Sequence, residues 1–277
     1  MPRAIDRLDR RVIAAWRRRL TWGTVVDQRI DSLGAFFAVI DAFLKPGQEF
    51  WFRGHGDSTW TLVPSALRYP TVGEREEALA LVSEFRRSAP LRLPREELPA
   101  TTEDLQWLAL AQHYGVPTRL LDWTENAAAA LYFAVSEHDD RDGAVVILDP
   151  ASLNELALPA GLRGPRRRIL DVHGDQEILL RYLRLGPQPR RNGCHTLALH
   201  PVLGMRRILV QKGAFTFHGS RCFALEKGHA PGLLVIPILN GSKRGLRLEL
   251  QRIGVDRMTL FPEPEHLARE LRERKGL

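Results

Sequence analysis

Residues 144–149, Ala-Val-Val-Ile-Leu-Asp, are almost entirely apolar. Such a short apolar run predicts a strand buried within a sheet. Helical patterns with one apolar face precede it at 33–44, 73–89, 103–114 and 125–138. Because helices and strands do not alternate regularly along the chain, the sequence favours an α+β fold over a doubly wound sheet.

The remaining pattern predicts one domain built around a mostly antiparallel central sheet with flanking helices. Further strands are expected at 49–53, 118–123, 206–211, 214–219, 233–238 and 246–250. Amphipathic helices are expected at 5–20 and 264–274. We therefore divide the chain into an N-terminal helical extension at 1–30, a domain at 31–262 and a C-terminal helix at 263–277 that packs on the domain.

The composition is that of an ordinary globular protein. The 277 residues are 44% hydrophobic and 26% charged, which excludes a wholly disordered chain or a coiled coil. No apolar run is long enough to cross a membrane, and the first residues lack the apolar core of a signal peptide. With only Cys194 and Cys222, no disulfide framework is expected. These features predict a cytoplasmic protein without a membrane partner.

Much of the net charge of +7 comes from arginines clustered between residues 160 and 195. A concentration of guanidinium groups suits a phosphate-bearing partner such as a nucleic acid. The residues expected to form this phosphate patch are Arg166, Arg167, Arg168, Arg190 and Arg191. An ordinary solvated, arginine-rich surface is the open alternative.

Two segments carry polar residues where a packed core would carry apolar ones. In the first, residues 51–68, an arginine at the end of an aromatic strand is followed by Gly-His-Gly, and glycine allows close approach of the backbone. In the second, residues 108–135, four polar side chains lie among large apolar residues: Gln112, His113, Arg119 and Asp122. Buried polar groups need partners, so we expect these four to bond to one another or to a ligand.

These segments resemble the FRG domain family, named for Phe-Arg-Gly, which is Phe52-Arg53-Gly54 here. The matching residues are Trp60, Pro64, Ser65, Arg68, Gln112-His113-Tyr114-Gly115, Pro117-Thr118-Arg119-Leu120-Leu121-Asp122-Trp123-Thr124, Ala130-Leu131-Tyr132-Phe133-Ala134 and Gln211-Lys212-Gly213-Ala214-Phe215-Thr216. The family occurs in bacterial and phage-related contexts. The resemblance therefore implies a role in a defence or toxin system, in which a cognate neutralising protein could be a partner.

A fainter resemblance connects the chain to ADP-ribosyltransferases. These enzymes have an Arg-Gly on the first core strand, a Ser-Thr-Ser strand, a helix of the type Ala-Leu-x-Phe-Ala, an apolar strand and a late strand that bears a glutamate. This chain departs from the pattern because it has no Ser-Thr-Ser at the second position. The corresponding segments here are Arg53-Gly54, Leu121-Asp122-Trp123-Thr124, Ala130-Leu131-Tyr132-Phe133-Ala134, Val145-Val146-Ile147-Leu148 and Gln211-Lys212-Gly213-Ala214-Phe215. The resemblance implies an ADP-ribosyltransferase-like fold with a split sheet, NAD as cofactor, and a protein or nucleic acid as acceptor.

The same resemblance implies roles for individual residues. Gln211 stands where a transferase has its catalytic glutamate, and a neutral amide cannot supply negative charge to the developing cation. Either another carboxylate, Asp122 or Glu177, supplies this charge, or the activity is low or absent. The guanidinium groups of Arg53 and Arg119 would pair with the pyrophosphate. The expected catalytic residues are Arg53, Asp122 and Gln211. The expected cofactor-binding residues are Arg53, Gly54, His113, Tyr114, Arg119, Trp123, Thr124 and Tyr132.

Several alternatives stay open at this point. Arg53 and Asp122 could form a structural ion pair, and Trp123 could be a core residue. The protein could also be a non-catalytic nucleotide or nucleic-acid binding module, or a nucleic-acid-processing enzyme such as a nuclease. No metal is expected: Cys194, His195, His200 and Cys222 lack a paired Cys-x-x-Cys, and a metal nuclease needs several clustered carboxylates.

Overall fold

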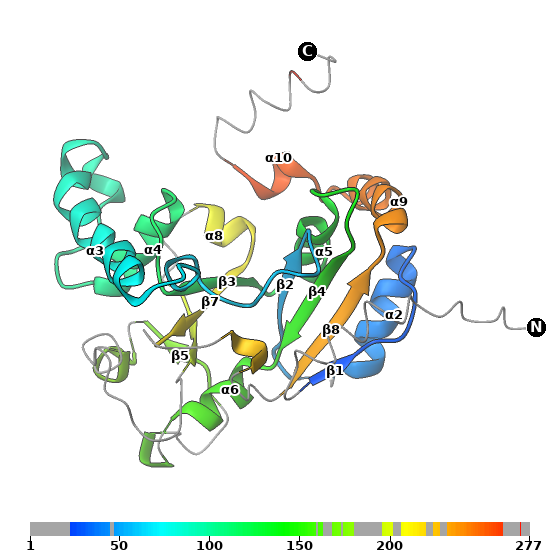
Figure 1. Cartoon of the computed structure of the whole chain (residues 1–277), viewed down its shortest axis with the longest axis horizontal. Helices are drawn as coiled ribbons and strands as arrows, with labels where there is room; N and C mark the ends of the chain where they lie inside the picture. Colours follow the sequence, from blue (N-terminus) through cyan, green and yellow to red (C-terminus); the bar gives the residue numbers. More distant parts are fainter. Residues whose placement is uncertain are drawn as a thin grey trace, which may run out of the picture.

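A central open sheet organises the molecule (Figure 1). The computed structural model describes residues 23–44, 47–158, 160–162, 168–172, 174–179, 196–201, 206–219, 224–227, 232–262 and 272. The strands are β1 (Gly23–Val25), β2 (Trp51–His55), β3 (Leu120–Thr124), β4 (Gly143–Leu148), β5 (Leu170–Asp171), β6 (Thr196–His200), β7 (Gly213–His218) and β8 (Leu233–Ile238). They form one 8-stranded sheet in the order β1-β8-β4-β2-β3-β7-β6-β5.

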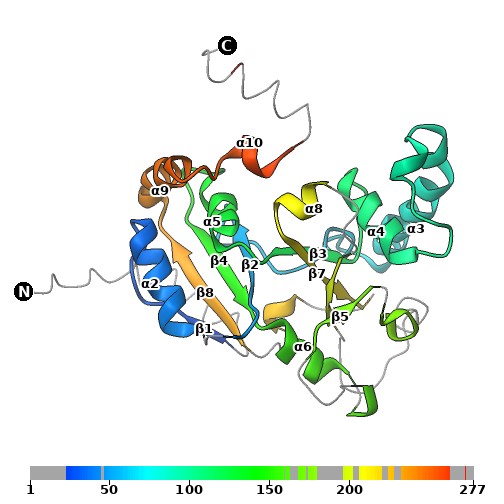
Figure 2. The ribbon, with the colours of Figure 1, turned by 180° about the vertical axis from the view of Figure 1, so that it is seen from behind.

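Most neighbouring strands are antiparallel; the pairs β1–β8 and β5–β6 are parallel. The helices are α2 (Leu33–Phe43), α3 (Val72–Ser88), α4 (Asp104–His113), α5 (Ala127–Val135), α6 (Pro150–Ala157), α8 (Arg206–Val210), α9 (Asn240–Arg252) and α10 (Arg257–Leu260). Figures 1 and 2 place α2 and α9 at the β8 side of the sheet and α3 and α4 at the β3–β7 side. The predicted α+β class with a mostly antiparallel sheet is therefore confirmed.

The apolar run at 144–149 forms β4, the buried strand that its pattern predicts. All six residues of β4 are buried, and they alternate between two core clusters. Val145 and Ile147 pack with α5 and α9 on one face, whereas Val146 and Leu148 pack with Trp51 on the other. Because each face is covered, the strand can be apolar throughout.

Helix α5 packs against β2 with almost no space between the two backbones. A Cβ atom added to Gly54 would lie 1.9 Å from the carbonyl oxygen of Ala130 and 2.7 Å from the amide nitrogen of Ala134. Only a residue without a side chain fits there. The alanines of α5 complement this glycine because they also allow a close approach, and Asn126 caps the helix by accepting from Ala128 and Ala129.

The sheet separates between β2 and β3. All five residues of β2 pair with β4, and all five of β3 pair with β7, but β2 and β3 share the single pair Phe52↔Thr124. Beyond that pair the two strands leave room for side chains. This opening positions the candidate site described below.

Two predicted strands are helices instead, so those predictions were wrong. Residues 206–211 contain α8, and 246–250 lie inside α9. In 246–250 the leucines alternate with charged residues, which imitates a strand. However, Leu246 and Leu250 are buried four residues apart while Leu248 is 50% exposed, which is helical spacing.

The expected helices at 5–20 and 264–274 lie outside the described residues, apart from position 272, which is helical. The described part of 1–30 contributes β1, which pairs with β8. None of the described helices has the length and apolar character needed to cross a lipid bilayer.

Candidate functional site

A pocket of about 500 Å³ lies where β2 and β3 separate. Residues of β2, β3, β7, α4, α5, α8 and α10 contribute to its walls. The charged residues among them are Arg53, Arg207, Arg257, Asp122 and Glu137. This volume is within the range of small-molecule sites, which is about 300–1,000 Å³.

Arg53 spans the opening between the two strands. Its Nη1 donates to the main-chain carbonyl of Asp122 at 2.5 Å, and its Nε lies 3.1 Å from Nε2 of His55. Burial lowers the pKa of Arg53 to about 10. The negative charge of Asp122 opposes this shift, whereas the positive charge of Arg68 lowers the pKa further. The guanidinium therefore stays charged at neutral pH. Its hydrogen bond to Asp122 connects β2 and β3 where their backbones do not pair.

The carboxylate of Asp122 is held by a chain of motif residues. Gln112 Nε2 donates to Asp122 Oδ1 at 2.6 Å, and Thr118 Oγ1 donates to Gln112 Oε1. The amide of Thr118 in turn donates to Ser65 Oγ at 3.2 Å. Within the described residues, Oδ2 of Asp122 has no hydrogen-bond partner. One oxygen is therefore fixed by the protein and the other is available to a ligand.

Additional positive charge surrounds His218 behind this opening. Burial, together with the charges of Arg53 and Arg119, lowers the pKa of His218 to about 3. The imidazole is therefore neutral at pH 7; its Nε2 lies 3.0 Å from Thr216 Oγ1, while its buried Nδ1 has no partner among the described residues. Arg119 lies 4.5 Å over the ring of Phe217, and burial lowers its pKa to about 10. No described carboxylate forms an ion pair with Arg53 or Arg119.

Gln211 lies in the turn between α8 and β7, not on a strand as we expected. Its Nε2 donates to the carbonyl of Leu260 at 2.9 Å, which anchors α10. Phe261, the next residue, lines the pocket and lies under the guanidinium of Arg207 at 4.8 Å. Gln211 thus contributes to the pocket and also fixes one of its walls.

The structure brings most of the predicted site residues to this one pocket. Those that line it are Arg53, Gly54, His113, Asp122, Trp123, Thr124, Tyr132 and Gln211. Tyr114 and Arg119 are not among its lining residues. The hydroxyl of Tyr114 donates to Glu97 at 3.0 Å instead, and Glu177, the other carboxylate considered for catalysis, does not line the pocket either.

The aromatic surface of the pocket differs from the expected one. Trp123 is 3% exposed, and its indole donates to Thr216 within the core, which is the core role that the sequence left open. Trp60 lines the pocket and is 42% exposed. Its ring packs edge-on against His55 and His138. Of the two tryptophans that line the pocket, Trp60 is therefore the more accessible for stacking on a ligand.

Sequence reasoning missed several pocket residues. Glu137 follows α5, and Lys243 Nζ fixes this segment by donating to the carbonyls of Gly56, Glu137 and His138 at 2.7, 2.9 and 2.9 Å. Arg207 comes from α8, which the sequence predicted as a strand. Arg257 and Phe261 come from the α10 region, for which no motif gave a signal. No local pattern indicated α8, because the continuous apolar run Ile208-Leu209-Val210 is equally typical of a strand.

Four of the five residues of the predicted phosphate patch lie outside the described residues: Arg166, Arg167, Arg190 and Arg191. The described member, Arg168, forms an ion pair with Asp175, and its main-chain carbonyl accepts from Asn154 at 3.2 Å. Arg168 does not line the pocket.

One family profile matches the chain. Residues 48–143 match the FRG domain, and this match includes β2, α4, β3 and α5 together with Arg53, Gln112 and Asp122. No curated protein and no solved structure matches the chain. The resemblance inferred from Phe52-Arg53-Gly54 is therefore confirmed, and the chain contains an FRG domain.

Proposed function

We propose that this FRG-domain protein binds NAD in the pocket between β2 and β3 and uses it in ADP-ribosyltransferase-like chemistry. One observation carries the proposal: the guanidinium of Arg53 and the carboxylate of Asp122 lie in the same pocket, and Asp122 keeps one oxygen without a described partner. A cation suits the phosphates of a dinucleotide, and an anion suits a ribose that develops positive charge.

The pocket residues fit such a ligand by charge and shape. The pocket has three arginines, Arg53, Arg207 and Arg257, against two carboxylates, and this excess of positive charge favours an anionic molecule. Trp60 offers an exposed aromatic surface for a base or for nicotinamide.

In the proposed reaction the ribose–nicotinamide bond breaks and its electron pair leaves with nicotinamide. An acceptor oxygen or water bonds to the same carbon and loses a proton. Asp122 is placed to stabilise the positive charge that develops on the ribose, which Gln211 cannot do because its amide is neutral. Glu137 is the second carboxylate of the pocket and can accept the proton from the acceptor. Asp122 and Glu137 thereby replace the missing transferase glutamate.

The order of the elements also supports the proposal. An Arg-Gly strand, β2, precedes β3, then the helix α5 with its Ala-Leu-Tyr-Phe-Ala segment, and β7 comes late in the chain. The sheet separates next to the Arg-Gly strand, as a split ADP-ribosyltransferase-like sheet would. A defence or toxin role and a macromolecular acceptor stay predictions from the family resemblance.

Nicotinamide release from NAD by the purified protein tests the activity, and calorimetry with ADP-ribose tests binding separately. We expect release that Asp122→Asn slows about a hundredfold or more, with binding of ADP-ribose retained. Glu155→Gln, on α6 and outside the pocket, is the matched control. Binding without release would identify a non-catalytic nucleotide-binding module. A protein that neither binds ADP-ribose nor releases nicotinamide overturns the proposal.

A further inference from the structure

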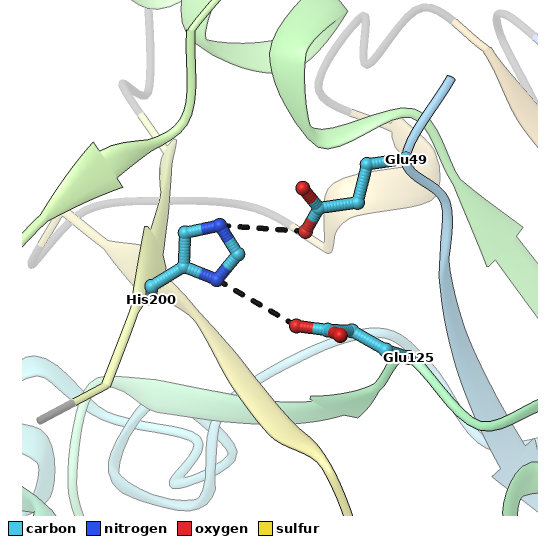
Figure 3. A group of neighbouring side chains, drawn as sticks. All are labelled: Glu49, Glu125 and His200. Carbon is cyan, nitrogen blue, oxygen red and sulfur yellow. Dashed lines mark ion pairs between the residues drawn. The ribbon is translucent and has the colours of Figure 1, made fainter. Parts of the chain in front are cut away.

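Three side chains meet at one edge of the sheet, outside the pocket. Glu49 lies two residues before β2, Glu125 directly follows β3, and His200 is the last residue of β6. Strands β3 and β6 are both antiparallel to β7, so their ends lie at the same edge, and β2 begins there because it is antiparallel to β3. Figure 3 shows one ring nitrogen of His200 facing Glu49 and the other facing Glu125.

Each of the two imidazole nitrogens of His200 faces a carboxylate oxygen. Its Nε2 lies 3.4 Å from Glu49 Oε1, and its Nδ1 lies 3.7 Å from Glu125 Oε1. A neutral imidazole carries one proton, so one of its nitrogens presents a lone pair. Here that lone pair would face a carboxylate oxygen, which is also an acceptor. A metal ion bound to one nitrogen, with the imidazole proton on the other nitrogen, suits both carboxylates.

The distances are longer than those of hydrogen bonds and leave space for a metal ion. Charge-assisted hydrogen bonds between nitrogen and oxygen measure about 2.7–2.9 Å. Both separations here exceed that range. Nitrogen and oxygen atoms that bind one tetrahedral Zn²⁺ at about 2.0–2.2 Å are themselves about 3.4 Å apart. The Nε2–Oε1 separation has this value, and one ligand atom from each of the three residues lies within 4.8 Å of the others.

The surroundings hold the ligands in place and leave them accessible. The buried indole of Trp51 donates to Glu49 Oε1 at 2.7 Å, and its ring packs edge-on against His200 with centroids 5.6 Å apart. Such contacts around metal ligands orient the ligands. The side chains of Glu49, Glu125 and His200 are 40%, 41% and 34% exposed, so an ion can enter from solvent.

We propose that Glu49, Glu125 and His200 form a binding site for a divalent transition-metal ion of the zinc type. One imidazole and two carboxylates are a mixed nitrogen–oxygen ligand set, which suits Zn²⁺ better than Mg²⁺ or Ca²⁺. Three protein ligands leave at least one coordination position for water or a ligand. None of the three residues lines the pocket, so this site is independent of the proposed NAD chemistry.

Zn²⁺ titration of the chelator-treated full-length protein, followed by calorimetry, tests the site. We expect one equivalent to bind, and Glu49→Gln, Glu125→Gln and His200→Gln each to weaken binding at least tenfold. Glutamine at position 49 keeps an acceptor for Trp51, so the fold should survive this change, and melting temperatures without metal check this. Glu76→Gln, an exposed residue of α3, should bind Zn²⁺ as the wild type does.

Co²⁺ absorption then reports the geometry, and intense tetrahedral bands are expected in the wild type and in Glu76→Gln but not in the three site variants. The proposal is overturned if the wild type binds no stoichiometric Zn²⁺. It is also overturned if a variant that combines the three substitutions binds Zn²⁺ as the wild type does, since the ion would then occupy another site. Binding of Ca²⁺ or Mg²⁺ in preference to Zn²⁺ would contradict the assigned ion.

Discussion

The guanidinium of Arg53 bonds to the main-chain carbonyl of Asp122 and not to its carboxylate. The carboxylate accepts from Gln112 instead. The structural ion pair that the sequence left open is therefore absent from the described residues. This arrangement joins β2 to β3 through a side chain while leaving the carboxylate able to meet a ligand.

Replacing Arg53 with lysine tests the role of its planar guanidinium. An ammonium group cannot bond to Asp122 and His55 together with a phosphate in the same fixed geometry. We expect Arg53→Lys to weaken ADP-ribose binding about tenfold or more, which corresponds to about 1.4 kcal/mol. Calorimetry measures the binding, and the melting temperature separates loss of the site from unfolding. Arg92→Lys, outside the pocket, is the control; unchanged binding by a folded Arg53→Lys would contradict the phosphate role.

Gln112 and Asp122 should act as one unit in the nicotinamide-release reaction. The amide of Gln112 fixes Asp122 Oδ1, so Gln112→Ala should lower the rate by releasing the carboxylate. In the Asp122→Asn background, Gln112→Ala should lower the rate by a smaller factor. A double-mutant cycle on the rates should therefore give a coupling energy of about 1 kcal/mol or more. Additive losses would show that Gln112 does not act through Asp122.

The sequence predicted the pocket residues of β2, α4 and β3 better than those of α8 and α10. Arg53, Gln112 and Asp122 were identified because polar residues in apolar segments need partners, and this argument needs no knowledge of the fold. Arg207, Arg257 and Phe261 reach the pocket only through long-range packing of α8 and α10. Nothing in their local sequence distinguishes them from surface residues.

The same reasoning explains why the Glu49–Glu125–His200 cluster was not expected. Its members are separated by 76 and 75 positions, and none belongs to a metal-binding motif. They meet because three strand termini share an edge, which depends on the strand order. The order β2-β3-β7-β6 cannot be read from hydrophobic patterns, whereas the burial of β4 can.

His218 should make the stability of the protein depend on pH. Its pKa is about 3 in the folded protein, below the ordinary value of 6.5, so the unfolded chain binds the extra proton between these values. The stability from keeping this imidazole neutral is complete above pH 6.5 and falls as the pH drops toward 3. Between pH 7 and 4.5 the loss from this residue should be about 3 kcal/mol.

Urea unfolding at both pH values checks this effect in the wild type and in His218→Gln. Glutamine does not titrate, so the variant should lose less stability on acidification. The difference in free energy of unfolding between the two proteins should therefore shrink by about 3 kcal/mol from pH 7 to pH 4.5. Other groups titrate equally in both proteins and cancel in the comparison. Parallel pH profiles for the two proteins would show that His218 does not carry this dependence.

Gly54 should tolerate no side chain. A methyl group would lie 1.9 Å from Ala130 O and 2.8 Å from Phe133 Cβ, and the first contact is with helix backbone, which cannot rotate away. Gly54→Ala must therefore move α5 from the sheet, at a cost of about 3 kcal/mol or more. The neighbouring Gly56→Ala is a matched control, because its Cβ would come no closer than 3.4 Å to any atom. Denaturant unfolding should find Gly56→Ala near the wild type and Gly54→Ala strongly destabilised. Equal stabilities for the two variants would mean that α5 does not depend on this contact.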